Sequence, residues 1–130
     1  MEIKVGVDII EVSRVQRSVE EIGDGFINRV FTDVEIKYCE NTKKTMYQHY
    51  AARFAAKEAT FKAVSTLLSD KYSISWKNIQ VVNDANGKPN IEFVALDKKV
   101  EKELQKINSI DVSLSHLQEY AVANVSVIID

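Results

Sequence analysis

The sequence has 130 residues, 45% of them hydrophobic, and its 17 Lys and Arg residues nearly balance 19 Asp and Glu residues to give a formal charge of −2. A chain of this length can bury its own core as one domain (1–130) without disulfides, and Cys39 is the only cysteine. Apolar runs such as Val127–Ile129 are far below the roughly 20 residues that span a bilayer, the charged start resembles no signal peptide, and the small net charge disfavours nucleic-acid binding through an overall field. We therefore expect a cytoplasmic domain with neither membrane nor nucleic acid as partner.

The predicted elements follow from hydrophobic periodicity and from helix-capping signals. Thr32 and Glu35 have the spacing of a capping box, which predicts a helix start. The longest helix is predicted over 46–68, a stretch without Gly or Pro that is rich in Ala and Lys. The predicted order is strand 3–8, helices 12–22, 32–41 and 46–68, a hairpin of strands 76–82 and 91–95, helix 97–107, and strands 110–115 and 120–129. This order implies a single α+β domain, with an antiparallel sheet packed against one long helix and several shorter ones.

Asp8 closes the first predicted strand, directly before two apolar residues. A helix N-cap would explain an Asp at such a position without any functional role. If the strand instead runs beside the long helix, Asp8 and Glu58 can meet. Two carboxylates at one point are the oxygen ligands that Mg²⁺ prefers when it also holds substrate phosphates.

Glu58 is the residue of the long helix that fits a purely structural pattern least well. On a helical wheel it lies within about 40° of Phe54, in the middle of the predicted apolar stripe. A core-facing carboxylate must be neutralised, hydrogen-bonded, paired with a base or bound to a metal. An ion pair with Lys62, four residues later, is the structural alternative to a metal site.

The near-zero charge of the whole chain conceals a basic segment. Residues 41–62 contain five Lys or Arg residues against Glu58 alone, a local charge of +4 that leaves −6 for the rest. Basic residues around a metal site suit a phosphorylated ligand, whereas a solvated helix face is the ordinary explanation.

The segment Ser113–His116 alternates along a predicted strand, with Ser113 and Ser115 on one face and His116 at the strand end. It lacks the strand–turn–helix context of a nucleophile elbow, so it does not indicate a hydrolase. Cys39 and His49 have no further ligands in a metal-binding spacing.

Five motifs stand in order along the chain and together resemble one family. They are Gly6–Arg14, Phe26–Glu35 with the pattern Phe-x-x-Arg-x-Phe-Thr-x-x-Glu, Arg53–Ala59 followed by Lys62-Ala63, Gly87–Pro89, and Ser113–His116. The chain resembles the holo-[acyl-carrier-protein] synthases, the small single-domain class of 4′-phosphopantetheinyl transferases. The resemblance implies Mg²⁺-dependent transfer of the phosphopantetheine arm of coenzyme A to a serine of apo-acyl carrier protein, for fatty acid biosynthesis. It also implies release of adenosine 3′,5′-bisphosphate and a homotrimer with active sites at the subunit interfaces.

The same resemblance implies roles for residues at the expected metal site. Asp8 and Glu58 would be the Mg²⁺ ligands, and Lys62 would neutralise charge on the leaving phosphate. Either Glu58 or a water held by the metal would accept the proton of the carrier serine.

Further residues are implied as substrate contacts. Arg53 and His116 would bind coenzyme A phosphates, and Ser113 and Ser115 would line the nucleotide end. The arginines Arg14, Arg17 and Arg29 would dock the acidic recognition helix of the carrier protein, with simple surface solvation as the alternative for Arg17.

Two departures from the family pattern concern glycine. No glycine occurs between Gly25 and Gly87, and Lys4 stands where a glycine is common. The long helix is therefore expected to continue further, and the loop toward Trp76 to contact coenzyme A differently. A non-catalytic member of the same fold that binds carrier protein or coenzyme A is the main alternative, and an unrelated α+β interaction module is a third.

Overall fold

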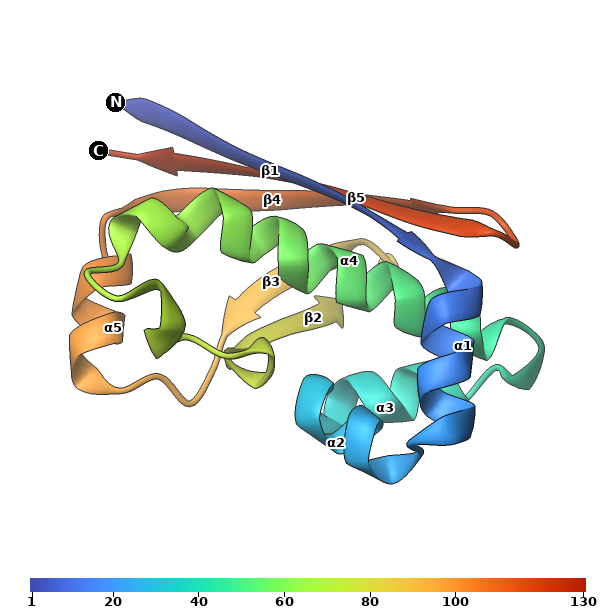
Figure 1. Cartoon of the computed structure of the whole chain (residues 1–130). Coiled ribbons are helices and arrows are strands. Elements are labelled where there is room, and N and C mark those ends of the chain that lie inside the picture. The colour runs from blue at the N-terminus through green and yellow to red at the C-terminus, as the bar shows by residue number, and fades with distance from the viewer.

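The computed structural model describes all residues from 1 to 130, and Figure 1 shows them in three layers with one long helix in the middle. A three-stranded sheet covers one side of this helix, and a hairpin with short helices covers the other. In chain order the strands and α-helices are β1 Glu2–Glu11, α1 Val12–Glu21, α2 Asp24–Val30, α3 Asp33–Glu40, α4 Met46–Val64, β2 Ile79–Asn83, β3 Pro89–Phe93, α5 Lys98–Leu104, β4 Ile107–His116 and β5 Tyr120–Ile129. Four short 3₁₀ turns also occur, at Lys43–Thr45 (η1), Ser65–Leu67 (η2), Lys71–Ser73 (η3) and Trp76–Asn78 (η4).

The larger sheet is antiparallel, with strand order β1-β5-β4. Glu2 pairs with Ile129, so the two ends of the chain lie side by side. The central strand β5 buries every second residue toward α4: Ala121, Ala123, Val125, Val127 and Ile129. One face of strand β5 is thus buried in the interior of the subunit.

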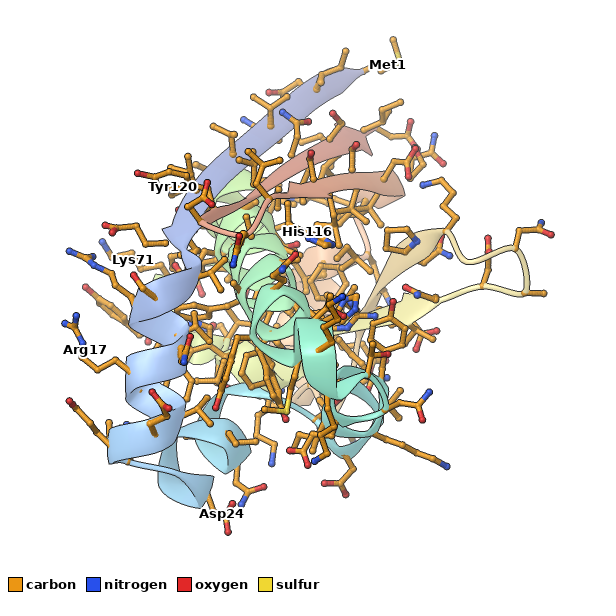
Figure 2. The ribbon with its side chains drawn as sticks, turned by 90° about the vertical axis from the view of Figure 1, so that its right-hand side faces the viewer. Met1, Arg17, Asp24, Lys71, His116 and Tyr120 are labelled. Atoms are coloured by element: carbon orange, nitrogen blue, oxygen red, sulfur yellow. The ribbon has the colours of Figure 1, made fainter.

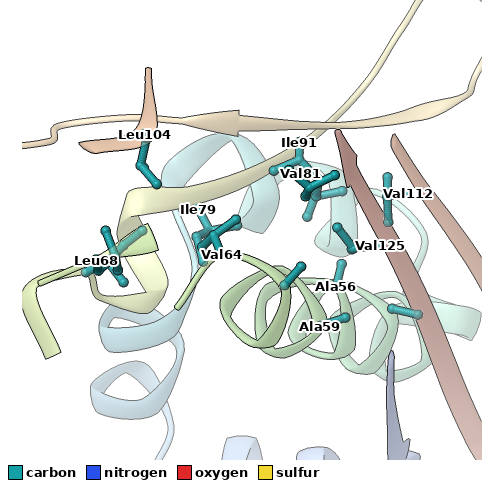
Figure 3. Close-up of a cluster of buried hydrophobic side chains, with 14 of the residues drawn as sticks. Ala56, Ala59, Val64, Leu68, Ile79, Val81, Ile91, Leu104, Val112 and Val125 are labelled. Carbon is teal, nitrogen blue, oxygen red and sulfur yellow. The ribbon is translucent and has the colours of Figure 1, made fainter. Parts of the chain in front are cut away.

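Helix α4 is buried on almost every side, because it lies between the sheet and the hairpin layer. Eleven of its 19 residues are buried, so its burial does not follow a single apolar stripe. Small residues allow this close packing, and Figure 3 shows Ala56 and Ala59 beside Val125 of β5. The main core joins this face of α4 to Val81 and Ile91 of the hairpin and to other apolar residues of the sheet and α5.

Gly6 sets the distance between β1 and α4. A Cβ atom at this position would lie 1.9 Å from the backbone oxygen of Ala59, which no side chain can tolerate. The absence of a side chain lets β1 lie directly against α4. The first strand therefore runs beside the long helix, which was the condition for Asp8 and Glu58 to lie near each other.

Several sequence-based boundaries are confirmed and others are wrong. The capping box at Thr32 and Glu35 is present, and Asp97 caps α5 as expected. The α+β class and the β2–β3 hairpin are also confirmed. Strand β1 continues past Asp8 to Glu11, so Asp8 is not an N-cap.

Three differences bear on the functional site. Helix α2 was not predicted, because Gly23 and Gly25 suggested only a turn. Helix α4 ends at Val64 and continues only as η2, so the expected extension to residue 68 is wrong. Trp76 lies in η4 and not in a strand, which frees its side chain from the alternation of the hairpin.

Candidate active site

Asp8 and Lys62 meet where β1 crosses the C-terminal half of α4. Lys62 Nζ lies 3.0 Å from Asp8 Oδ1 and donates to the carbonyl oxygen of Val7, also at 3.0 Å. The Lys62 side chain is 53% exposed, whereas that of Asp8 is only 16% exposed. The ammonium group can therefore reach a ligand from solvent while it remains paired with a half-enclosed carboxylate.

Glu58 lies one turn before Lys62 on α4, but the two do not form the ion pair considered from the sequence. Instead, the indole Nε1 of Trp76 donates to Glu58 Oε1 at 2.6 Å. Glu58 is half-buried at the edge of an apolar cavity of about 390 Å³ that includes Phe61, Tyr72 and Trp76. The prediction that Glu58 faces the core is only partly correct, because the side chain is half-buried and lines this cavity.

The oxygen atoms of this region fit a divalent cation. Asp8 Oδ2 is buried and has no hydrogen-bond partner, which is costly for a carboxylate oxygen unless a ligand satisfies it. Carboxylate oxygens are the protein ligands of Mg²⁺, which commonly uses one or two of them together with substrate phosphates. No cluster of three or more His, Cys, Asp or Glu side chains exists, so an all-protein metal cage is absent. Asp8 and Glu58 fit a site that phosphate oxygens and water complete.

Lys57 precedes Glu58 but belongs to the interior. Lys57 Nζ lies 2.7 Å from Glu35 Oε1, and both side chains are 0% exposed. Lys57 also donates to the carbonyl oxygens of Trp76 and Ile79. Burial lowers the pKa of Lys57, and Glu35 opposes that shift. The sequence showed Lys57 only as part of the basic segment 41–62, because no local pattern connects it with Glu35, 22 residues earlier.

Arg53 lies at the base of a second cavity, of about 310 Å³, between α4, the hairpin and the end of β4. We name it the basic pocket; its charged or ionisable lining residues are Tyr38, His49, Arg53, Lys88 and His116. Arg53 donates to Asn83 Oδ1 at 3.2 Å, and its guanidinium carbon lies 3.8 Å from the centre of the Tyr38 ring. Its Nε is buried without a hydrogen-bond partner. The pocket therefore holds a buried cation with an unused donor, which suits an anionic ligand.

The two histidines of the chain lie together at the mouth of this pocket. The rings of His49 and His116 are 5.6 Å apart, and His116 Nδ1 lies 2.8 Å from Gln48 Oε1. Partial burial, followed by the charges of His116 and Arg53, lowers the pKa of His49 from its ordinary value of 6.5. Figure 2 shows His116 at the end of its strand, where the sequence placed it.

The two serines of the Ser113–His116 motif differ in their position relative to the basic pocket. Ser113 lines the basic pocket together with Gly87 and Lys88 of the hairpin loop. Ser115 is exposed and does not line the pocket. Gly87 has φ +83°, a backbone conformation that favours glycine, so it permits the tight turn of that loop.

The three candidate docking arginines are all exposed, on α1 and α2 at one end of the molecule. Arg14 forms a loose pair with Glu11 at 3.5 Å and borders an apolar cavity of about 280 Å³. Ile10, Val15 and Phe26 are among the apolar residues of that cavity. Arg17 extends away from the body of the molecule in Figure 2.

A sequence model of the 4′-phosphopantetheinyl transferase superfamily matches residues 4–125, which include all three cavities and the Asp8–Lys62 pair. The chain therefore belongs to this superfamily. Its helices include none with the length and apolar character needed to cross a bilayer.

Named relatives narrow the class further. The chain is 45% identical over 125 residues to a holo-[acyl-carrier-protein] synthase of Ruminiclostridium cellulolyticum, covering 95% of this chain and 90% of the relative. The crystal structure of holo-[acyl-carrier-protein] synthase from Neisseria meningitidis superposes with a TM-score of 0.80 at 31% identity, over 96% of this chain and 97% of that one. The enzyme from Bacillus anthracis, solved in complex with CoA (3′,5′-ADP), superposes with a TM-score of 0.74 at 30% identity, over 95% and 94%.

Proposed function

We propose that this protein is a holo-[acyl-carrier-protein] synthase, which transfers the 4′-phosphopantetheine arm of coenzyme A to a serine of apo-acyl carrier protein. The observation that carries the proposal is the open Asp8–Lys62 pair beside Glu58, in a chain that shares its fold and up to 45% of its residues with such enzymes. The serine Oγ attacks the phosphorus that bears the pantetheine arm, the bond to the nucleotide phosphate breaks, and adenosine 3′,5′-bisphosphate leaves. We place the reaction in the cytoplasm and in the supply of carrier protein for fatty acid biosynthesis.

Asp8 and Glu58 would hold a Mg²⁺ ion, which supplies positive charge to the pyrophosphate of coenzyme A when bound. Positioning and charge stabilisation carry most of the catalysis in phosphoryl transfer. The half-exposed Lys62 ammonium stabilises the charge that develops on the departing phosphate. Two groups can accept the serine proton: Glu58, or a water beside the two carboxylates.

The basic pocket suits the phosphates at the nucleotide end of coenzyme A. Arg53 brings a buried cation with a free donor, and His116 lies at the pocket mouth. Ser113 lines the same pocket, whereas the position of Ser115 supports no contact there. Arg14 and Arg29 would meet the acidic carrier helix, with the apolar cavity beside Arg14 receiving an apolar side chain of that partner.

A homotrimer with sites shared between subunits is part of the proposal. Arg53 and Glu58 are five residues apart on α4, so their side chains leave the helix about 140° apart. One subunit therefore offers the basic pocket and the metal ligands on different sides. The outer face of β1 carries an apolar row that nothing in the subunit covers, Ile3, Val5, Val7 and Ile9, exposed by 55% to 64%. This row supports self-association. Light scattering measures the mass of the protein in solution, and the mass of a monomer would contradict the homotrimer.

The activity is tested by incubating the protein with apo-acyl carrier protein, coenzyme A and Mg²⁺ and weighing the carrier by mass spectrometry. We expect the carrier to gain the mass of one phosphopantetheine arm, and the gain to disappear when a chelator replaces Mg²⁺. An unmodified carrier would contradict the transferase and favour a binding module of the same fold.

A further inference from the structure

Trp76 is the only tryptophan of the chain, and it is the direct hydrogen-bond partner of Glu58. Its indole Nε1 donates to Glu58 Oε1 at 2.6 Å, while its ring packs edge-on against Phe54 at 5.8 Å between centroids. An indole N–H can only donate, so the carboxylate oxygen of Glu58 is the acceptor of this bond. With Oε1 occupied, Oε2 is the oxygen left for another ligand.

The backbone of Trp76 is itself fixed from inside the protein. Lys57 Nζ donates to the carbonyl oxygen of Trp76 at 2.9 Å and also to that of Ile79, so it holds both ends of turn η4. Glu35 balances the charge of Lys57 in the interior. Two neighbouring residues of α4 thus form hydrogen bonds with the same turn: Lys57 with backbone carbonyl oxygens, and Glu58 with the indole.

The cap of turn η4 removes further freedom. Asn78 Oδ1 accepts from the backbone N–H of Ser75 at 2.8 Å, and the Asn78 side chain donates to the carbonyl oxygens of Val94 and Ala95. The indole therefore belongs to a turn whose two ends and whose Asn78 side chain are hydrogen-bonded. A donor on such a support selects one orientation of a flexible carboxylate.

We propose that Trp76 is a positioning residue, which holds Glu58 in the orientation that binds the metal. The inference rests on the proposed function, because it takes Glu58 as a metal ligand. Carboxylates that bind metals are commonly oriented by an outer hydrogen bond, and loss of such a partner weakens metal binding about 10- to 100-fold. Glu58 would then reach the ion already oriented, with less side-chain freedom to lose on binding.

The test compares Trp76→Phe with the natural protein. Phenylalanine keeps an aromatic ring against Phe54 but removes the N–H donor together with the rest of the five-membered ring of the indole. Calorimetric titration of Mg²⁺ into the protein saturated with coenzyme A should show about 10-fold weaker binding. Coenzyme A binding in metal-free buffer should be unchanged, and the transfer rate should recover at high Mg²⁺. Tyr72→Phe is the matched control, since Tyr72 lies on the same cavity wall and its hydroxyl makes no hydrogen bond.

A second measurement needs no change at position 76. With selective excitation of tryptophan, fluorescence reports on Trp76 alone. Mg²⁺ titrated into the coenzyme A complex should therefore alter its emission, and Glu58→Gln should abolish that response. Equal Mg²⁺ affinity in Trp76→Phe and the natural protein would overturn the inference. Failure of the natural protein to bind Mg²⁺ or to modify the carrier would instead count against the proposed function.

Discussion

Helix α4 presents two lysines, five residues apart, that pair with carboxylates in opposite ways. Lys57 and Glu35 are fully buried 2.7 Å apart, and Lys57 also bonds two backbone carbonyls. Lys62 and Asp8 are 3.0 Å apart at the surface, with the ammonium half-exposed and one carboxylate oxygen without a partner. The Lys57–Glu35 pair has no hydrogen-bonding group left for a ligand. In the second pair, both the Lys62 ammonium and the Asp8 carboxylate can still bind one.

We therefore assign a structural role to the Lys57–Glu35 pair and a functional role to the Lys62–Asp8 pair. A buried ion pair is costly to desolvate, and removal of one partner leaves an uncompensated charge in the core. An exposed pair contributes little stability, typically below about 1 kcal/mol, so its geometry can serve a ligand at small cost to the fold. Variants of the two pairs should therefore fail in different ways.

The largest expected effect is on stability, from Glu35→Gln. It leaves Lys57 buried without a counter-charge, so we expect a loss of about 3–5 kcal/mol in the free energy of unfolding. Urea denaturation measures this loss. Asp111→Asn breaks the exposed pair with Lys88, which is 2.7 Å long, and serves as the control that should leave the midpoint nearly unchanged. Equal midpoints for the two variants would contradict a structural role for the buried pair.

Glu58→Gln should produce the opposite result. The amide keeps the size of the side chain and an oxygen for Trp76, but it removes the charge that a metal requires. We expect the rate of carrier modification to fall by at least about 100-fold, since even outer partners of a metal site cost 10- to 100-fold. The thermal midpoint should stay close to that of the natural protein. A near-normal rate would remove Glu58 from the metal site.

A direct comparison of the lysines sharpens the contrast. Lys62→Met should lower the transfer rate about 100-fold, as loss of one stabilising charge at a reacting centre does. It should lose less stability than Lys57→Met, because the Lys62 ammonium is half-exposed whereas that of Lys57 is fully buried. Lys57→Met should instead destabilise the fold, because it leaves Glu35 buried alone. A Lys62→Met variant that unfolds readily and keeps its rate would reverse the assignment.

The smallest effect concerns the basic pocket, whose burial lies between these extremes. The lowered pKa of His49 means that the unfolded chain binds a proton more readily than the folded protein. Stability is therefore unaffected by His49 above its ordinary pKa of 6.5 and falls as the pH drops below that value. His49→Gln should reduce the fall in melting temperature between pH 7.5 and 5.5. The same fall in melting temperature in His49→Gln as in the natural protein would contradict a contribution of His49 to the pH dependence of stability.

Local patterns predicted much of the fold, and contacts between distant segments account for what was missed. The capping box at Thr32 and Glu35 was visible because its residues are three apart. The bond from Glu35 to Lys57 and that from Trp76 to Glu58 have no such signal, since 22 and 18 residues separate the partners. Lys57 was counted in the basic segment 41–62 without any sign of its burial, because periodicity does not reveal a helix covered on both sides.

The candidate site was predicted through its motif and only partly through its geometry. Gly6 in the first motif proved to be the point where β1 touches α4, and this contact brings Asp8 to Lys62. The ion pair between Glu58 and Lys62, considered as the alternative to a metal site, is absent, and each residue instead makes a longer-range contact. Charge counting identified a basic segment, but it could not separate the buried Arg53 and Lys57 from the half-exposed Lys62.

The central claim is that Asp8 and Glu58 bind one divalent cation against the pyrophosphate of coenzyme A. A crystal structure of the protein with coenzyme A and Mn²⁺, read by the anomalous signal of the metal, tests it most directly. We expect one ion bound by an oxygen of each carboxylate, at close to the roughly 2.1 Å typical of Mg²⁺. An ion held elsewhere, or carboxylates more than about 8 Å apart, a distance that no single ion of that bond length can bridge, would contradict it.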